Sequence, residues 1–577
     1  MSKKSKKEEI KEEKLADTIR DRIAVSIKFM KDWKASVDTA NLYWTGKSRP
    51  KSISRENYYS VNYIYAIIKD SIARMYYRNP QINVEPVNGK DPAIFTNAKN
   101  AQLVLNWQAQ KKEYRLRDHI KLALLDWQRT GMGVVFTGWT TLLEQEKDEI
   151  KRIQKDQPDI KRIHPKHIYL APGFTRDKID YVVLEYQVPL KEVKNNKNFN
   201  QKVLDGFNIT SYLDKEWRDD GNGGTRVKET EDMARVTLYH YYDAEHWFVM
   251  LKGADDPLME KENPYTAVFG EDNPLPITII WGDDDLASPF PISKIDPIKD
   301  VVRELSMIRS QQVNHRKRFN RKALYDSNSI DETKIEKLKN PDDGTMIGIA
   351  LESGKTLDGA IYPIPEQPLQ YPFQIEPMVK EDIYVISGTT PTALTGKSAN
   401  PTLGQDELSA KSAQNREEED QSQVEQFVEA IYQRLLQLDQ TYLQQPVAMQ
   451  VSGSIDHQWM ELTSTDIAGG MTLKVISGSM VRETDEVVRK QAMDVLNLVG
   501  MLPIGQPLIP EIIQKILDTF PMFSDIAEKI RRMMAQPQPP ILPPQMGETG
   551  NGPMNQSILN QNAPTASGLS NGANKIT

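Results

Sequence analysis

Two long helical segments with narrow apolar faces place the strongest constraint on the fold of this chain. The first is predicted over residues 296–322, a length of about 40 Å for a continuous α-helix. Its apolar residues recur at helical spacing only as far as Ile308, and the residues that follow are polar and basic. The second helix is predicted from about residue 405 to residue 443, and its first half has almost no apolar face. Such helices are not buried in their own domain, so we expect solvent or neighbouring chains to cover them.

The residues around these two helices predict where each one begins and ends. Asp296 and Pro297 form a favourable N-cap and first-turn pair, so we expect the first helix to begin there. Residues 323–372 form an insertion that is interrupted by prolines, and a short helix is predicted at about 377–387. Residues 388–404 are small and polar, which predicts a loop that leads into the second long helix.

The part of the chain before the first long helix is predicted to mix helices and strands. Helical periodicity predicts helices at about 16–34, 62–77, 96–111 and 116–129. Alternating aromatic and β-branched residues predict strands at 81–86, 131–139, 181–186, 236–242, 247–251 and 277–281. Near the other end of the chain, two helices are predicted at about 486–498 and 511–519. The predicted fold class is α+β with a substantial antiparallel component.

Composition excludes several classes of protein. The 577 residues include 73 Lys and Arg against 80 Asp and Glu, a formal net charge of −7. This balance argues against a protein that coats nucleic acid through a globally basic surface. The chain has no cysteine, which excludes disulfides and thiolate sites. Its length leaves room for more than one hydrophobic core.

Both ends of the sequence are polar. Residues 1–14 are a mixed-charge run without the apolar region of a secretory signal. Residues 536–577 are rich in Pro, Gln, Asn, Gly and Ser, and they contain too few apolar residues to support a core. We therefore expect both segments to be disordered. No stretch approaches 18 consecutive apolar residues, so we expect no membrane-spanning segment.

The motifs that would indicate catalysis are mostly missing. There is no GxxxxGK[ST], no GxGxxG after a strand and no GxSxG. His164 and His167 have metal-ligand spacing, but no third ligand accompanies them in the sequence. The acidic triplet at 283–285 is compatible with a divalent-metal nuclease, although a solvated turn is the favoured interpretation. We therefore expect no enzyme, no metal site and no cofactor, and turnover with magnesium or manganese would contradict this.

One basic cluster stands out from the acidic background. Its members are His315, Arg316, Lys317, Arg318, Arg321 and Lys322. One interpretation is a solvated helix end, where cations complement the helix dipole. The other is contact with nucleic acid or with an acidic surface of a neighbouring chain. The sequence favours neither.

The predicted loop at 388–404 is the second candidate functional segment. Its polar side chains can form weak, neutral hydrogen bonds to phosphates, and its only charge is Lys397. The residues in question are Thr389, Thr390, Thr392, Thr395, Lys397, Ser398 and Asn400. The alternative interpretation is an ordinary surface connection.

The order of these parts resembles the portal (head-to-tail connector) family of tailed bacteriophages. Residues 61–80, which end in Arg78-Asn79-Pro80, look like an early portal helix before a strand. Residues 163–172 are similar to another portal stretch, with Ala171 where the family commonly has an acid. The most specific match, residues 387–396, resembles the run that precedes the portal tunnel loop. The resemblance covers about residues 60–535, and each motif by itself is degenerate.

The resemblance implies a portal fold with a mixed α/β wing, a two-helix stem, a small clip and a helical crown. It implies the following assignments: a leader at 1–14, wing or body at 15–293, stem helix at 294–322, clip at 323–372, returning stem helix at 373–387, tunnel loop at 388–404, long wing helix with following strands at 405–480, crown at 481–535 and tail at 536–577.

The resemblance also implies a function without catalysis. Portal proteins form a ring, usually of twelve subunits, at one capsid vertex, where the ring is the channel for packaging and ejection of double-stranded DNA. The implied partners are further copies of the chain, the terminase large subunit, a head–tail adaptor, and the major capsid and scaffolding proteins. The implied location is the virion, after assembly in the host cytoplasm.

Two alternatives remain open from the sequence. One is another structural virion protein such as a head–tail adaptor, although adaptors are usually shorter and lack this order of helices. The other is a metal-dependent DNA-processing enzyme that uses the acidic triplet. Images of the purified chain and a turnover assay distinguish the three.

Overall fold

The computed structural model describes helices and antiparallel sheets in one chain, so the fold is α+β. The described residues are 3–87, 92–145, 151–206, 235–319, 323–325, 354, 356, 361–363, 370–389, 403–443, 447–450, 459–476, 479–480 and 493–494. The chain divides into two compact units, Met1–Thr484 and Asp485–Thr577. All described residues except 493–494 lie in the first unit, so the predicted crown and tail fall almost wholly outside the described residues.

The chain begins with two consecutive helices, α1 (Lys3–Phe29) and α2 (Lys31–Trp44). We expected a disordered leader over residues 1–14 and one helix at 16–34. Instead the helix begins at Lys3, because Lys and Glu are strong helix formers and stand at spacings of three and four with opposite charge, as in Lys4 and Glu8. The two helices meet at Met30, which is not helical.

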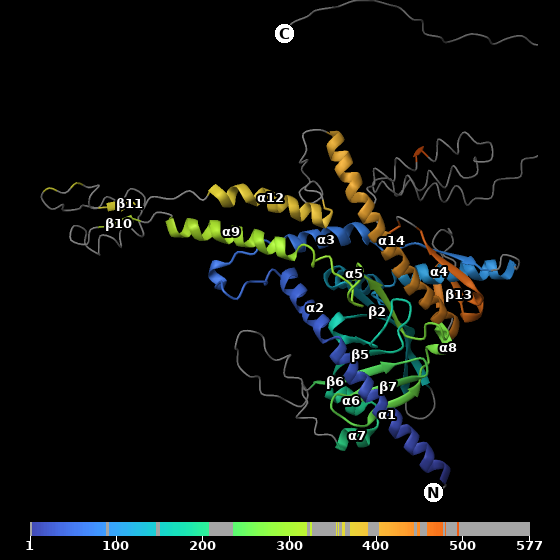
Figure 1. Ribbon diagram of the computed structural model, residues 1–577. Helices are drawn as coiled ribbons and strands as arrows, with labels where there is room; N and C mark the ends of the chain where they lie inside the picture. Colours follow the sequence, from blue (N-terminus) through green and yellow to red (C-terminus); the bar gives the residue numbers. More distant parts are fainter. Residues whose placement is uncertain are drawn as a thin grey trace, which may run out of the picture. The chain divides into compact units, whose positions relative to one another are not determined.

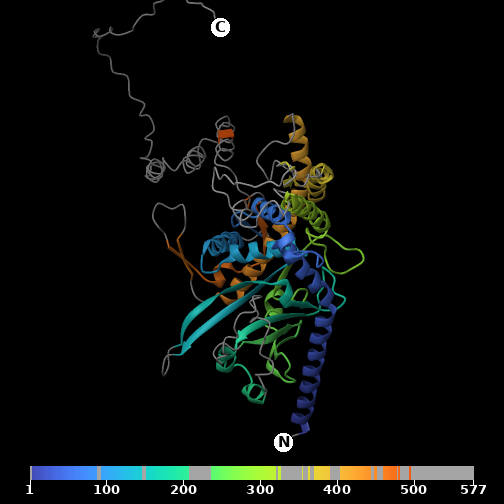
Figure 2. The same cartoon turned by 90° about the vertical axis from the view of Figure 1, so that its left-hand side faces the viewer.

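A five-stranded antiparallel sheet forms the lower part of the body (Figures 1 and 2). Its strands are in sequential order: β4 (Ile168–Leu170), β5 (Val182–Pro189), β6 (Arg235–Tyr242), β7 (His246–Leu251) and β8 (Pro257–Glu262). Alternate residues of β6 and β7 enter two different cores. One core contains Ile19 and Ile23 of α1, and the other contains α6 (Leu190–Asn195) and α7 (Gln201–Gly206).

A three-stranded sheet in the order β3-β2-β9 lies next to helix α5 (Leu116–Thr130). Its strands are β2 (Met132–Gln145), β3 (Lys151–Ile163) and β9 (Ile277–Trp281). At Gly133 a Cβ would lie 2.2 Å from the Ala123 carbonyl oxygen, so only glycine permits α5 to approach β2 so closely.

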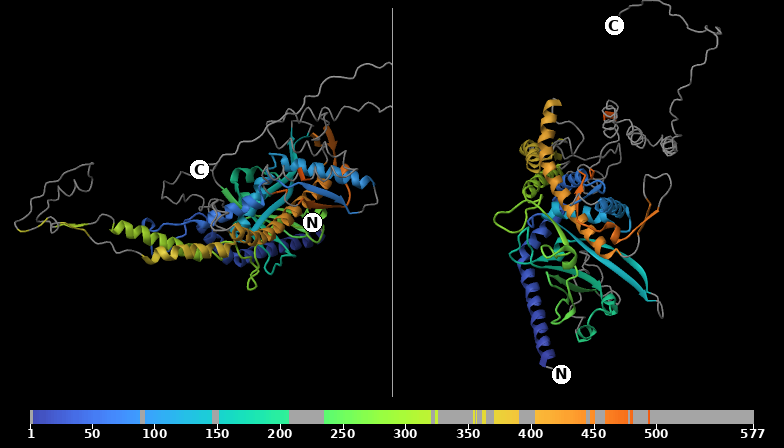
Figure 3. Two further views of the ribbon diagram at one scale, coloured as in Figure 1. Left: turned by 90° about the horizontal axis from the view of Figure 1, so that it is seen from above. Right: turned by 90° about the vertical axis from the view of Figure 1, so that its right-hand side faces the viewer.

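A second group of elements packs around helix α14 (Leu403–Tyr442), which runs across the body (Figures 1 and 3). The helices are α3 (Tyr63–Met75) and α4 (Pro92–Gln110), and the paired strands are β1 (Ile82–Pro86) with β14 (Met471–Val475) and β12 (Val447–Gln450) with β13 (Trp459–Leu462). The apolar stripe predicted for the second half of α14, from Val424 to Leu438, is buried. The periodicity of these helices therefore gave their positions within a few residues, except that α4 begins earlier than predicted.

Helices α9 (Lys299–Phe319) and α12 (Gln370–Ser387) pack side by side and extend away from the sheets (Figures 1 and 3). Strands β10 (Ala323–Tyr325) and β11 (Ile361–Pro363) pair between them in sequence. Most of the predicted clip lies outside the described residues. Short elements complete the fold: η1 (Arg55–Asn57), η2 (Pro165–His167), α8 (Thr266–Phe269) and η6 (Ser464–Ile467). No helix in the described part of the chain has the length and apolar character needed to cross a bilayer.

The beginning of α9 differs from the prediction. Asp296 is not the N-cap: its side chain accepts hydrogen bonds from the Ser293 backbone N–H at 3.2 Å and the Ser293 hydroxyl at 2.7 Å. The Asp296 N–H in turn donates to Ser293 Oγ at 3.2 Å. This reciprocal pair resembles a capping box, and its spacing of three residues was readable in the sequence. The regular helix begins at Lys299.

Candidate functional site

A connection in the same chain, residues 46–61, contacts the polar side of α9, and we call it the arm. It contains η1 (Arg55–Asn57), and its last residues, 58–61, are extended. Three side chains, one helical turn apart on α9, bond the backbone of alternate arm residues. The bonds run from Val61 N to Ser306 Oγ at 3.1 Å, from Tyr59 N to Ser310 Oγ at 2.9 Å and from Asn314 Nδ2 to Asn57 O at 2.7 Å. The spacings match because four helical residues and two extended residues both advance by roughly 6 to 7 Å.

The hydroxyl groups of Ser306 and Ser310 each accept one hydrogen bond from the arm and donate another within α9. Ser306 Oγ donates to the Val302 carbonyl at 2.9 Å, and Ser310 Oγ donates to the Ser306 carbonyl at 2.6 Å. Both serines are buried, which only a fully hydrogen-bonded hydroxyl tolerates well. We expected solvent or neighbouring chains to cover the polar half of α9 beyond Ile308. In the described part of that half, Asn314 and Lys317 contact the arm, so the chain itself covers this side.

Helix α12 covers another side of α9. Val379 and Ile383 of α12 are buried in one core with Val302, Leu305 and Ile308 of α9. Beyond this core, Glu376 accepts hydrogen bonds from Lys380 at 2.7 Å and from Gln312 at 2.9 Å. These two bonds lower the pKa of Glu376. The two helices are thus joined by apolar packing near the body and by polar contacts further out.

The described members of the basic cluster lie beside the arm. His315 is half-buried, and Arg316 and Lys317 are exposed. Lys317 Nζ lies 5.0 Å from the centroid of the Tyr59 ring of the arm, a cation–π contact. Arg318 belongs to α9, but the structure does not describe its side chain. Arg321 and Lys322 fall outside the described residues.

The arm adds cations that sequence analysis missed. Lys47, Arg49, Lys51 and Arg55 are all exposed, and the arm has a single carboxylate, Glu56. Together with Arg316 and Lys317 they form what we call the basic surface. In the described part of the chain, none of its six cations forms an ion pair. The available signal was four cations within nine residues, but nothing local indicated that the arm would contact α9.

A set of ion pairs fixes the position where α9 leaves the body. Lys294 Nζ lies 3.1 Å from Asp420 of α14 and 3.5 Å from Asp283. Burial of Lys294 favours the neutral amine, but these two carboxylates hold its pKa above the usual value. Arg74 of α3 contacts Glu417 of α14 in a second pair. Two polar residues of α14, Glu417 and Asp420, therefore have partners within the chain, whereas Glu418 and Glu419 are exposed, as expected.

The acidic triplet makes contacts that are typical of a structured turn. Asp283 pairs with Lys294, Asp284 pairs with Arg176, and Asp285 Oδ1 accepts a hydrogen bond from Ala287 N at 3.0 Å. No group of three His, Asp or Glu side chains in the described ranges is arranged to hold a metal ion. His164 Nδ1 accepts a hydrogen bond from Lys166 N at 3.0 Å. Burial, and to a lesser extent nearby cations, lower the pKa of His164 to about 3.

Only the first residue of the predicted tunnel-loop set is described. Thr389 is buried, and its N–H donates to the Tyr384 carbonyl of α12 at 3.2 Å. This residue is part of the end of α12 and does not face open solvent. Thr390, Thr392, Thr395, Lys397, Ser398 and Asn400 lie outside the described residues.

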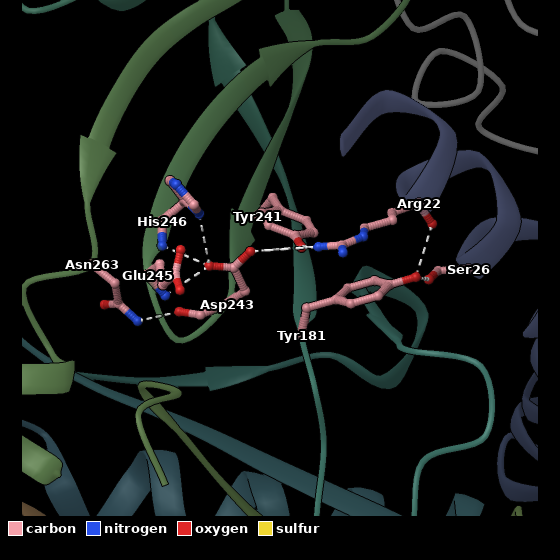
Figure 4. Close-up of polar contacts among 8 residues, drawn as sticks. All are labelled: Arg22, Ser26, Tyr181, Tyr241, Asp243, Glu245, His246 and Asn263. Carbon is pink, nitrogen blue, oxygen red and sulfur yellow. Dashed lines mark hydrogen bonds and ion pairs between the residues drawn. The ribbon is translucent and has the colours of Figure 1, made fainter. Parts of the chain in front are cut away.

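A polar cluster that sequence analysis did not identify ties α1 to the five-stranded sheet (Figure 4). Arg22 Nη1 donates to the Tyr241 hydroxyl at 2.6 Å, and Tyr241 donates to Asp243 at 3.0 Å. Asp243 also accepts from the backbone N–H groups of Glu245 and His246 in the turn between β6 and β7. The carboxylate of Asp243 accepts hydrogen bonds from the turn between β6 and β7 and from Tyr241, which in turn bonds Arg22 of α1. We therefore interpret this cluster as structural.

Comparison with known proteins gives no independent identification. The chain matches no model of a known protein family. It also matches no curated protein.

Proposed function

We propose that this chain is a portal protein, one subunit of a ring that forms the DNA channel at a single vertex of a tailed-bacteriophage capsid. The observation that carries the proposal is the helical hairpin of α9 and α12. The two helices extend from the α+β body, a paired element (β10 and β11) lies between them in sequence, and the long α14 follows. This is the succession of stem helix, clip, returning stem helix and long wing helix that the sequence resemblance implies.

The surface of the hairpin supports an assembled state. The arm covers one side of α9 and α12 covers another, but the outward face of α12 exposes Met378, Val385 and Ile386. Apolar side chains along one helix face are typical of a contact with another chain. A closed ring of identical contacts between different surfaces provides such cover for every subunit.

The proposed role is a conduit without catalysis. The net charge of −7 fits a channel through which a duplex slides, because a protein that neutralises many phosphates holds DNA tightly. In this proposal the ring has twelve subunits and receives the terminase large subunit and later the head–tail adaptor. It is bordered by major capsid and scaffolding proteins, and it resides in the virion.

The first prediction is that the purified full-length chain forms rings with a central hole. Negative-stain images and light scattering at several salt concentrations measure this directly. A species that remains a single chain at high protein concentration under all these conditions contradicts the proposal. If rings form but have no effect on DNA packaging when they are included in a capsid-assembly reaction, the result favours another structural virion protein.

A further inference from the structure

The outward face of α12 combines two carboxylates with apolar side chains. Met378, Glu381, Asp382 and Val385 follow one another at spacings of three, one and three residues, so they share one face of the helix. Met378 is 64% exposed and Val385 is 66% exposed. In the described part of the chain, neither Glu381 nor Asp382 forms an ion pair. We call these four residues the acidic stripe.

The acidic stripe and the basic surface lie on different sides of the hairpin. The arm bonds to one row of α9, Ser306, Ser310 and Asn314, whereas α12 packs against the row that contains Leu305, Ile308 and Gln312. These two rows are separated around the helix, and Figure 1 shows α9 between α12 and the arm. Within one chain the stripe and the basic surface therefore point away from α9 in different directions.

We propose that in the assembled ring the acidic stripe of α12 packs against the basic surface of the adjacent copy. This inference rests on the proposed ring. Glu381 and Asp382 would meet the exposed cations of the neighbouring arm and α9, while Met378 and Val385 would pack against the aliphatic parts of these long side chains. Complementary patches on different sides of one chain form a head-to-tail contact, which closes into a ring when the rotation permits.

A second copy of the chain would cover both the basic surface and the acidic stripe, whereas nucleic acid would cover only the basic surface. DNA phosphates would neutralise the basic surface, but they would leave the two carboxylates and the apolar side chains of the stripe exposed. A neighbouring chain covers both surfaces with one repeated contact. The charge complementarity also sets the register of the two copies.

Charge reversal tests the contact. The arm variant carries Arg49→Glu, Lys51→Glu and Arg55→Glu, and the stripe variant carries Glu381→Lys and Asp382→Lys. We expect each variant to lose rings in sedimentation velocity at about 0.1 M salt, where exposed charges still interact over roughly 10 Å. We expect the chain with all five substitutions to regain rings, because the reversed charges are again complementary. Mixing the two variants also restores complementary contacts.

Matched controls carry the same charge changes elsewhere. Lys191→Glu, Lys194→Glu and Lys197→Glu alter exposed lysines at α6, and Glu271→Lys with Asp272→Lys alters an exposed loop. Both controls should retain rings. A milder pair, Glu381→Gln with Asp382→Asn, covers the case in which a reversed variant does not fold. We expect it to raise the protein concentration for half-maximal assembly by about tenfold.

The outcomes separate the inference from the proposed function. If the parent chain forms no rings, the proposed function fails and this contact fails with it. Rings that persist in both reversed variants overturn the contact alone, as does loss of rings that the five-substitution chain does not reverse. An arm variant that keeps rings but loses binding of duplex DNA assigns the basic surface to nucleic acid instead.

Discussion

Asp439 of α14 has a side-chain carboxyl group that is completely buried between α14 and α4. Its only hydrogen-bond partner among the described residues is Gln108, whose Nε2 lies 2.9 Å from both carboxylate oxygens. Burial raises the pKa of Asp439 to about 7, although the bond from Gln108 lowers it. Gln108 Oε1 has no partner in the described core.

We predict that Asp439 makes stability decrease as pH rises from about 4 to 7. In this window the unfolded chain has released the proton that the folded chain retains, so the free energy of unfolding falls by up to about 1.4 kcal/mol per pH unit. Asp439→Asn mimics the protonated form and removes this dependence. Urea unfolding midpoints at pH 5 and pH 8 measure it, with the exposed Glu262→Gln as control. Equal effects of Asp439→Asn at the two pH values would falsify the raised pKa.

At the scale of elements, the contact between the arm and α9 depends on two hydroxyl groups. Ser306 and Ser310 accept the backbone N–H groups of Val61 and Tyr59, which have no ladder partner of their own in the described residues. A part-buried N–H that loses its acceptor costs free energy unless water replaces the bond. The serines therefore supply two of the three hydrogen bonds described between the arm and α9.

We predict that Ser306→Ala with Ser310→Ala releases the arm. Each lost acceptor should destabilise the folded chain by about 1–3 kcal/mol. Hydrogen exchange at the Tyr59 and Val61 amides should accelerate, and trypsin should cleave more readily at Lys51 and Arg55. Thr39→Ala is the matched control, because that exposed hydroxyl donates only to the Ala35 carbonyl of its own helix. Unchanged exchange at both amides would show that other contacts hold the arm.

At the scale of the whole molecule, the N-terminal helix is part of a core that is assembled from distant segments. Ile19 and Ile23 are buried together with residues of β5, β6 and β7. Ser26 Oγ lies 3.0 Å from the Tyr181 hydroxyl, and Arg22 bonds Tyr241, so polar contacts reinforce the apolar ones (Figure 4). The contribution of α1 to the described core begins at Leu15.

We predict that deleting residues 1–14 leaves the thermal unfolding midpoint unchanged, whereas deleting residues 1–29 lowers it. The longer deletion removes Ile19 and Ile23 and uncovers the apolar face beneath them, at about 1.5–3 kcal/mol for each buried side chain. Calorimetry on the two truncated chains measures the difference, and increased binding of a hydrophobic dye marks the uncovered face. A shorter deletion that destabilises as much as the longer one would show that residues 1–14 contribute packing of their own.

The sequence by itself determined the fold class, the positions of the longer helices and those of several strands, but strands such as β3, β4 and β8 were not predicted. Helical periodicity located α3, α5 and α14, and alternation located β1 and β6, because these signals are local and each element buries one face. Local reasoning was less successful at the ends of elements. It started α9 at Asp296, although the regular helix begins at Lys299 and Asp296 pairs with Ser293 in the preceding turn, and it left the leader disordered.

Only the tertiary structure decided which surfaces lie together. The run at 315–317 was visible as a charge cluster, but the cations of the arm, about 260 residues earlier, were not linked to it. Their proximity depends on Ser306, Ser310 and Asn314 bonding the arm, whereas Ser36 of α2 donates to the Trp33 carbonyl of its own helix. Asp439 and Arg434 likewise lie in a helix pattern that does not reveal their burial. Such contacts depend on pairing between distant segments, which residue spacing along the chain does not encode.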